Sequence, residues 1–246
     1  MSILIHIQTH SKANGKMLAI LLDPEKTALT DLNRRTESAD LVFVGGSTGE
    51  GADRLTEALK KQTDKPVILF PGNIQQITDQ ADALLFLSVL SSRNAEMLIG
   101  RQIEAARAVR QSGIETIPMG YILIDGGTHS SVEHTTRSQP IPQTDIEQIV
   151  STAIAAELLG MRLVYLEAGS GAKTPVSTDI IRSVRQAVSL PLIVGGGICT
   201  PEQMQQAFNA GADIVVIGNH FERHPEQIPL FRINESAGIK ASANIG

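Results

Sequence analysis

Residues 163–171 read Leu-Val-Tyr-Leu-Glu-Ala-Gly-Ser-Gly, a short apolar run that ends in a carboxylate and a glycine-rich turn. Two later segments have the same form: Leu192–Gly197 reads Leu-Ile-Val-Gly-Gly-Gly, and Ile214–Asn219 reads Ile-Val-Val-Ile-Gly-Asn. Uninterrupted apolar runs of this length are typical of parallel strands that are buried on both faces. The last part of the chain therefore predicts parallel strands whose carboxyl ends open into glycine-containing loops.

The same alternation extends outward over the whole chain. Eight apolar runs predict strands: Met17–Leu22, Leu41–Val44, Pro66–Phe70, Ala83–Leu87, Thr116–Ile124, Leu163–Leu166, Leu192–Val194 and Ile214–Ile217. Helical spacing of apolar residues predicts connectors over Asp53–Thr63, Ala95–Ser112, Asp145–Gly160, Thr178–Ala187 and Pro201–Ala210. This order predicts an α/β fold, a TIM (β/α)8 barrel, as one domain over residues 1–246. An open doubly wound sheet is the alternative, and the lack of a glycine-rich first βα turn disfavours it.

Three connecting segments have their own signals. Only Pro71–Asp82 separates the third and fourth predicted strands, so the third helix is expected to be short or replaced. Thr200-Pro-Glu-Gln203 combines an N-cap threonine, a proline and a glutamine, and predicts that a helix begins there. The long polar stretch Gly126–Thr144 follows the fifth strand and is a candidate lid over the barrel mouth.

Composition narrows the classes of function. The chain has 246 residues and a net charge of −5, which argues against a nucleic-acid partner. It contains no apolar run long enough for a membrane span and no signal-like N-terminus, so a cytoplasmic protein is expected. The single cysteine, Cys199, excludes an intrachain disulfide and fits a reducing compartment.

The loops after the last three strands carry the strongest chemical signal. Glycine lets backbone amides approach an anion closely, and barrels of this kind bind phosphate at loops seven and eight. The stretches Tyr165–Gly171, Gly195–Gly197 and Gly218-Asn219 therefore predict a phosphate site, to which Ser170 could add a hydroxyl donor. The alternative for any one of them is that its glycines only form a tight turn.

Glu167 is the first charged residue after the apolar core of the sixth strand. Its carboxylate is expected near the mouth, where it could hold the hydroxyls of a small polyol and take a proton from one of them. A salt bridge to a neighbour such as Arg162 is the alternative. Tyr165 is either a packing residue or a hydroxyl donor to the ligand.

A second cluster follows the first two predicted strands, in Asp23-Pro-Glu-Lys26 and Gly45-Gly-Ser-Thr-Gly49. Carboxylate and hydroxyl oxygens suit Mg²⁺, which rarely takes more than one or two protein carboxylates. Asp23 with Ser47 or Thr48 could complete a magnesium site together with a substrate phosphate. The alternative is that Asp23-Pro24 is an ordinary helix-start turn.

Taken in order, these motifs resemble those of the geranylgeranylglyceryl phosphate synthases and their close barrel relatives. The resemblance spans nearly the whole chain, and its most specific element is the Tyr-x-Glu-x-Gly-Ser string at Tyr165–Ser170. The other matching motifs are Leu22-Asp-Pro-Glu-Lys26, Val44-Gly-Gly-Ser-Thr48, Phe70-Pro-Gly72, Ser92-Arg-Asn94, Gly195-Gly-Gly-Ile198 and Gly218-Asn219. The family's barrel lacks the third helix, which agrees with the short Pro71–Asp82 connector.

The resemblance implies a Mg²⁺-dependent prenyltransferase of lipid biosynthesis. It would join an allylic diphosphate, with geranylgeranyl diphosphate as the expected donor, to the 3-hydroxyl of sn-glycerol 1-phosphate and release diphosphate. By position, Asp23 and Ser47 would bind Mg²⁺, and Glu167 would orient or deprotonate the hydroxyl. Glycerol phosphate would contact Tyr165, Leu166, Glu167, Ala168, Gly169, Ser170, Gly171, Gly196, Gly197, Gly218 and Asn219.

Contacts to the diphosphate, the oligomeric state and the alternative functions complete the expectations. Arg93 and Arg137 are candidates for diphosphate contacts, whereas Leu21 stands where some relatives have a lysine, and Arg137 or Gln139 stands where a lid lysine is expected. A homo-oligomer is expected for this family. The alternatives are another phosphosugar enzyme and a non-catalytic phosphometabolite-binding protein; a Schiff-base aldolase is disfavoured because no predicted strand contains a lysine.

Overall fold

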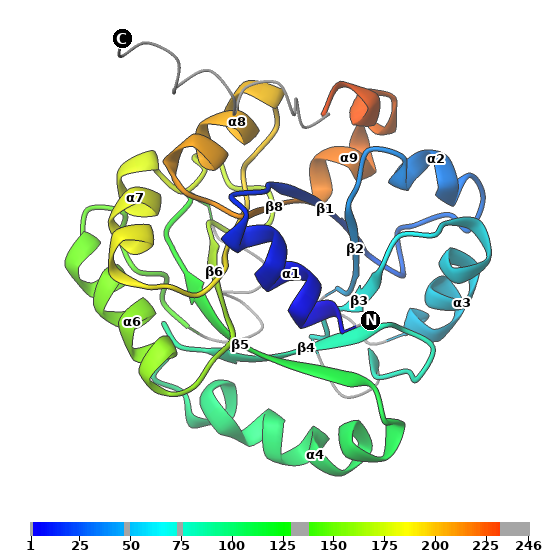
Figure 1. Cartoon of the computed structure of the whole chain (residues 1–246), viewed down its shortest axis with the longest axis horizontal. Coiled ribbons are helices and arrows are strands. Elements are labelled where there is room, and N and C mark those ends of the chain that lie inside the picture. The colour runs from blue at the N-terminus through cyan, green and yellow to red at the C-terminus, as the bar shows by residue number, and fades with distance from the viewer. Residues whose placement is uncertain (1, 47–49, 73–75, 129–137, 232–246) are drawn as a thin grey trace, which may run out of the picture.

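The computed structural model describes residues 2–46, 50–72, 76–128 and 138–231, and in these residues the chain forms a closed parallel barrel (Figure 1). The strand order is β1 to β8 in sequence, and β1 pairs with β8 through Met17 and Ile214. The strands are β1 Met17–Leu22, β2 Leu41–Val44, β3 Val67–Leu69, β4 Ala83–Val89, β5 Glu115–Leu123, β6 Leu163–Glu167, β7 Leu192–Gly195 and β8 Ile214–Ile217. The predicted barrel is confirmed and the open sheet is wrong, because the first and last strands are hydrogen-bonded to each other.

Helices surround the barrel on its outer side (Figure 1). They are α2 Leu32–Thr36, α3 Ala52–Gln62, α4 Arg101–Ser112, α6 Ile146–Leu158, α7 Thr178–Ala187, α8 Pro201–Ala210 and α9 Asn219–Arg223. A π-helical turn over Glu96–Gly100 runs directly into α4, and a 3₁₀ turn covers Pro225–Leu230. The predicted helix start at Thr200 is confirmed, since Thr200 and Gln203 form a complete capping box.

The predicted loss of the third helix is also confirmed for the described part of the β3–β4 connection, which contains no α-helix. Hydrogen bonds from two side chains fix this connection in place of a helix. The buried Gln76 accepts from the Gly72 amide at 2.6 Å and donates to the Gly46 carbonyl at 3.1 Å, while Arg101 donates to the Gly72 carbonyl at 2.9 Å. These bonds hold the short connection against the β2 loop and the start of α4. Of the predicted lid, residues 129–137 lie outside the described residues.

The strand side chains divide into two apolar layers, as the period-2 geometry of a strand requires. The outward layer packs under the helices, for example through Val164 and Leu166 of β6. The inward layer fills the barrel and contains a group of four rings, with centroids 5.3 to 6.3 Å apart, made by Phe43, Phe70, Tyr121 and Tyr165. Side chains of the described residues therefore pack the interior of the barrel.

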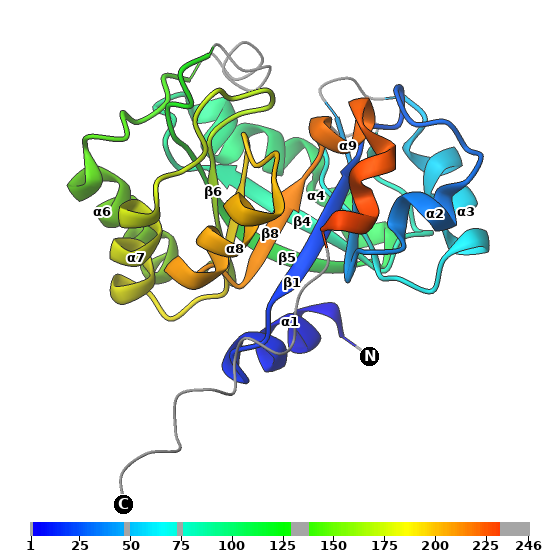
Figure 2. The same cartoon turned by 90° about the horizontal axis from the view of Figure 1, so that it is seen from above.

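Helix α1, Ile3–Lys12, lies across the amino-terminal end of the barrel (Figures 1 and 2). Ile3 and Ile7 are buried in the inward layer, so this helix closes that end of the core. The sequence predicted no helix over these residues, and the N-terminus was noted only as not signal-like. The helical signal was weak, because Ile3 and Ile7 are buried but the apolar Ile5 between them is exposed, and the residues after Ile7 are polar.

Glu115, the first residue of β5, fastens the start of α1 to the barrel. Its carboxylate accepts from the Ser2 hydroxyl at 2.6 Å and from the amides of Ile3 at 2.7 Å and Leu4 at 2.9 Å. Burial by itself raises the pKa of Glu115, but the hydrogen bonds from Ser2, Leu4 and Ile3 outweigh it, so this pKa lies below its ordinary value.

Three aspartates repeat one device at the same end of the barrel. Asp40, Asp82 and Asp213 each directly precede an even-numbered strand. Each amide donates at 2.8 Å to the carbonyl of a residue in the preceding strand, and each carboxylate accepts the amide of that same residue at 2.8 Å; the partners are Leu18, Val67 and Leu192. The acidic side chain satisfies a strand amide that would otherwise lack a partner.

Among the described strands, β6 is the one even-numbered strand that no aspartate precedes. Arg162 precedes β6, and its amide donates to the carbonyl of Pro118 at 2.9 Å. Proline has no amide hydrogen, so no acidic side chain is needed at this position.

No helix among the described residues is long and apolar enough to cross a lipid bilayer.

We predict that Glu115→Gln lowers the free energy of unfolding by about 1–3 kcal/mol, because an amide group would face the Ile3 amide, donor against donor. Thermal or urea unfolding measures the loss. The control is Glu147→Gln, which removes an exposed carboxylate from the first turn of α6 and is expected to cost less.

The difference between the wild type and Glu115→Gln should also depend on pH. Because the pKa of folded Glu115 lies below its ordinary value of 4.5, its stabilisation is complete above about that pH. It is lost as the pH falls through the lower folded value. A difference that stays constant into acid would contradict a role for the ionised carboxylate.

Candidate active site

The carboxyl ends of the strands lie at the end of the molecule opposite α1 (Figure 2). In barrels of this type the loops at this end carry the chemistry, whereas the other end contributes stability. The closure of β8 onto β1 brings the loops after β6, β7 and β8 beside the loops after β1 and β2. The two predicted clusters therefore share one end of the barrel.

Glu167 is the last residue of β6, and its side chain shares the inward face with Tyr165. It is 8% exposed, and its carboxylate accepts from the Gly169 amide at 2.7 Å and from the Tyr165 hydroxyl. The alternative pairing with Arg162 is not formed between these two described residues, because Arg162 precedes β6 at the opposite end of the strand.

Burial controls the protonation of this group. It raises the pKa of Glu167, and the hydrogen bonds from Tyr165 and the Gly169 amide offset only part of the effect. Burial and the nearby Glu167 carboxylate raise the pKa of Tyr165 and of Tyr121 well above the ordinary value of 10.0. Both phenols therefore stay protonated, and Tyr165 can only donate to the carboxylate. Glu167 is thus oriented by Tyr165 and has a basicity suited to accepting a proton.

The end of β7 and the loop after it pack closely against Glu167. A Cβ on Gly195 would lie 2.3 Å from the Tyr165 hydroxyl and 2.9 Å from Glu167 Oε2. A Cβ on Gly196, which has φ of +80°, would lie 2.4 Å from Glu167 Oε1 and 2.7 Å from the Gly169 amide nitrogen. Glycine is required at both positions because the carboxylate and its partners already fill the space.

The same loop presents unpaired backbone donors. The amides of Gly196, Gly197 and Ile198 donate to no other residue in the part of the chain that the structure describes. Consecutive amides in a glycine turn form a concavity that suits an anion. The β6 and β7 loops are joined by the Ala168 amide, which donates to the Gly195 carbonyl at 3.0 Å. An anion that accepts hydrogen bonds from these amides would therefore lie beside Glu167.

The other residues predicted to bind substrate differ in what they can offer. Leu166 and Ala168 pack in the outward layer, so only their backbone faces the site. Ser170 and Gly171 are exposed, Gly169 is buried, and both of these glycines have positive φ, of +97° for Gly169 and +76° for Gly171. Gly218 lies next to Leu21 of β1, and the side chain of Asn219 lies outside the described residues.

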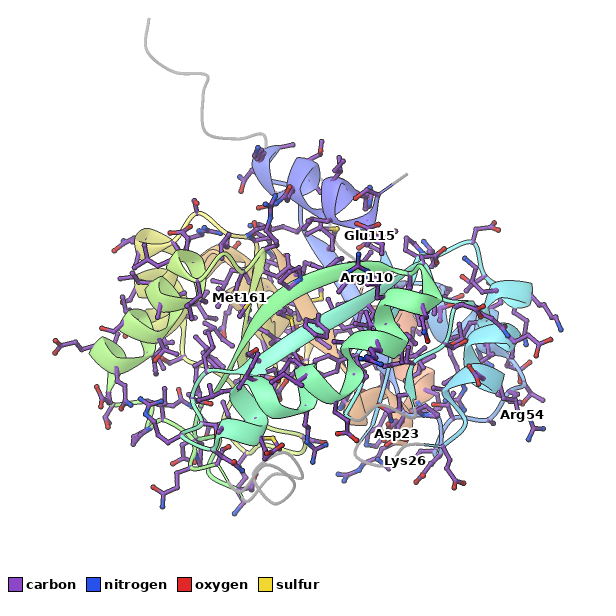
Figure 3. The ribbon with its side chains drawn as sticks, turned by 90° about the horizontal axis from the view of Figure 1, so that it is seen from below. Asp23, Lys26, Arg54, Arg110, Glu115 and Met161 are labelled. Atoms are coloured by element: carbon purple, nitrogen blue, oxygen red, sulfur yellow. The ribbon has the colours of Figure 1, made fainter. Side chains whose placement is uncertain are left out.

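Asp23 follows β1 and is 7% exposed. Its Oδ2 accepts from Lys26 Nζ at 2.6 Å, its Oδ1 accepts from the Glu25 amide at 3.1 Å, and a Cβ on Gly46 would lie 2.8 Å from Oδ1. The chain continues from Gly46 to Ser47 and Thr48, which lie outside the described residues. Figure 3 shows Asp23 and Lys26 together, at the end of the molecule opposite Glu115.

The described residues contain no group of three or more His, Cys, Asp or Glu side chains that could enclose a metal ion. A closed protein site for a metal is therefore not formed by these residues. Mg²⁺ does not need one, because it commonly takes one or two carboxylates together with waters and substrate phosphates. Asp23 would supply one buried carboxylate to an open site of this kind.

The sequence indicated two basic residues, Arg93 and Arg137, as candidates for diphosphate contacts. Arg93 is exposed, and its guanidinium donates to the carbonyls of Leu90 at 3.3 Å and Ser92 at 3.0 Å within its own loop. Arg137 lies outside the described residues. The sequence indicated Lys26 only as part of a motif and gave no signal for Glu222 of α9, although Lys26 Nζ lies 3.9 Å from Glu222 Oε2.

The closed barrel, with glycine loops at the carboxyl ends of strands six to eight, defines a class of protein, the (β/α)8 barrel enzymes. Comparison with known proteins identifies the family within it. Residues 12–235 match the PcrB family. The chain belongs to this family, and it is an enzyme of the geranylgeranylglyceryl phosphate synthase type.

Curated relatives with this name are similar over most of the chain. The geranylgeranylglyceryl phosphate synthase of Zunongwangia profunda is 47% identical over 86% of this chain and 93% of its own length. That of Korarchaeum cryptofilum is 42% identical over 90% of this chain and 93% of its own. The crystal structure of the Thermoplasma acidophilum synthase, in complex with sn-glycerol 1-phosphate, is 35% identical with a TM-score of 0.87, covering 94% of this chain and 96% of that one.

We predict that Gly196→Ala destabilises the fold more than the matched change Gly160→Ala. Gly160 has nearly the same φ, +81°, but no atom lies within 4 Å of its added Cβ. Gly160→Ala should cost about 1–2 kcal/mol for a left-handed alanine. Gly196→Ala should cost about 1–3 kcal/mol more, because the methyl group would displace Glu167. Urea unfolding of the two variants measures both, and equal losses would show that Glu167 does not fill this space.

Proposed function

We propose that the protein transfers a prenyl group from an allylic diphosphate to the 3-hydroxyl of sn-glycerol 1-phosphate, with geranylgeranyl diphosphate as the donor. Membership of the PcrB family and the glycerol phosphate complex of the Thermoplasma acidophilum relative support this acceptor. The observation that carries the proposal is the contact between the β7 loop and Glu167. Amides for a phosphate and a basic carboxylate for a hydroxyl lie within one small site.

Binding of the acceptor follows from that contact. The amides of Gly196, Gly197 and Ile198 would hold the phosphate oxygens, helped by the β6 loop around Gly169. Glu167 would accept a hydrogen bond from a glycerol hydroxyl and fix its orientation, since its own position is set by Tyr165 and Gly169. Gly218 and Asn219 would contribute from the loop after β8.

The proton of the attacking hydroxyl would move to Glu167. As the 3-oxygen forms a bond to the allylic carbon, the bond from that carbon to the diphosphate oxygen breaks, and diphosphate leaves with the electron pair. The raised pKa of Glu167 favours this proton transfer compared with an exposed carboxylate.

The donor's diphosphate would lie toward the loops after β1 and β2. Asp23 would hold Mg²⁺ there, with Ser47 as a second ligand, and the cation would neutralise charge on the leaving diphosphate when bound. The buried carboxylate of Asp23 beside Gly46 is the observation that supports this assignment. Leu21 lies near Gly218 and provides no charge, so the diphosphate depends on the cation and on other basic residues.

The test is incubation of purified protein with Mg²⁺, radiolabelled sn-glycerol 1-phosphate and prenyl diphosphates of several lengths. We expect label in the organic extract with at least one donor, and none when Mg²⁺ is chelated. Absence of extractable label with every donor would overturn the proposed reaction. Full activity in the presence of chelator would remove the magnesium assignment and leave the acceptor site standing.

We predict that Glu167→Gln lowers kcat by roughly 10²- to 10⁴-fold, the range typical for loss of a general base. In the wild type, kcat/KM should rise with pH as Glu167 ionises, with a midpoint displaced above the ordinary value of 4.5. The variant should lack this rise.

Tyr165→Phe is the matched control, because it removes the hydrogen bond to Glu167 and keeps the carboxylate. It should retain the pH-dependent rise with the midpoint moved further up, since a donor that favours the ionised form is gone. Unchanged kinetics in Glu167→Gln would exclude Glu167 from proton transfer.

A further inference from the structure

Lys26 stands between two carboxylates that come from opposite ends of the chain. Its Nζ lies 2.6 Å from Asp23 Oδ2 and 3.9 Å from Glu222 Oε2. The carboxylates are shielded, with side-chain exposures of 10% for Asp23 and 17% for Glu222, whereas the lysine side chain is 56% exposed. Burying a carboxylate without a cation is costly, so this lysine is the counter-ion of Asp23 in the structure.

This pairing conflicts with the role assigned to Asp23 above. Both of its oxygens already accept hydrogen bonds, Oδ2 from Lys26 and Oδ1 from the Glu25 amide. A divalent cation bound at Oδ2 would lie within a few ångströms of the ammonium group, and repulsion between the two positive charges favours movement of the ammonium group away from Asp23. The exposed, flexible stem of Lys26 allows such a movement, and Glu222 is the acceptor already close to Nζ.

We propose that Lys26 is an exchangeable counter-ion, which holds Asp23 until a divalent cation displaces it and then moves its ammonium group to Glu222. The inference rests on the proposed function, since it takes Asp23 as the magnesium ligand. Lys26 is a positioning residue in this scheme, and Glu222 is its second acceptor.

The charges explain what the exchange achieves. Asp23, Lys26 and Glu222 together carry one negative charge, which does not favour an anionic substrate. Entry of a divalent cation turns this into one positive charge while both carboxylates stay neutralised. Arg35 and Arg223 also attract Glu222 electrostatically, and Glu25 attracts Lys26 in the same way. These charges lie around the three residues and add to their interactions. Binding of the metal ion would thus make the site more attractive to a diphosphate.

The experiment measures the binding of Mn²⁺ to the full-length protein in the presence of inorganic pyrophosphate, by electron paramagnetic resonance. We expect Lys26→Met to bind Mn²⁺ about three- to tenfold more tightly than the wild type, because the competing ammonium is absent. Lys60→Met is the matched control, since Lys60 Nζ pairs with Asp82 Oδ1 at a similar distance, 2.7 Å, in a different pair. It should leave Mn²⁺ affinity unchanged. Melting temperatures confirm that each variant is folded.

A double-mutant cycle separates exchange from simple attraction between Glu222 and the metal ion. Glu222→Gln should weaken Mn²⁺ binding in the wild-type background, because the displaced ammonium loses its acceptor. In the Lys26→Met background the same change should have a much smaller effect. An equal effect in both backgrounds, or unchanged or weaker Mn²⁺ binding in Lys26→Met, would overturn the exchange.

Asp23→Asn distinguishes failure of this inference from failure of the magnesium assignment. If Asp23→Asn abolishes Mn²⁺ binding but Lys26→Met does not tighten it, the metal site stands and the exchange is wrong. If Asp23→Asn binds Mn²⁺ as the wild type does, or if the wild type binds none, Asp23 is not the ligand and both fall.

Discussion

A carboxylate that is buried at the mouth of the barrel constrains the structure around it. Glu167 loses most of its hydration at the end of β6, and its ionised form persists only with donors at hydrogen-bond distance. The Tyr165 hydroxyl and the Gly169 amide supply them. Their close approach leaves no room for a side chain on Gly195 or Gly196. The glycines of the β7 loop are therefore explained by the carboxylate as much as by any anion that the loop binds.

The two ends of the barrel use acidic side chains in different ways. At the end covered by α1, Asp40, Asp82, Asp213 and Glu115 satisfy backbone amides and fasten strands and helix together. At the other end, Glu167 and Asp23 are held by donors that leave them facing the loops. Acidic groups at the first end contribute stability, whereas the proposed function gives those at the mouth a chemical role, in line with the division between the two ends of this fold.

The proposed exchange at Lys26 links the first and last parts of the chain. Lys26 and Asp23 follow β1, and Glu222 belongs to α9 after β8. They meet because β8 pairs with β1 and closes the barrel. The closure that creates a stable core therefore also creates the charge network at the mouth. A cation-dependent change in the sign of this network would couple metal binding to recognition of the second substrate.

The sequence by itself determined the eight strands, the missing third helix and the glycine loops, because each depends on local periodicity or on residues that force the backbone. It could not determine what touches Glu167: Arg162 was a reasonable partner by proximity in sequence, yet the length of the strand separates the two. Nor could it determine that two isoleucines make residues 3–12 a helix across the barrel, or that Lys26 faces Glu222. The packing of Gly195 and Gly196 against Glu167, of α1 against the barrel and of Lys26 beside Glu222 joins residues far apart in the chain, and only the closed barrel brings them together.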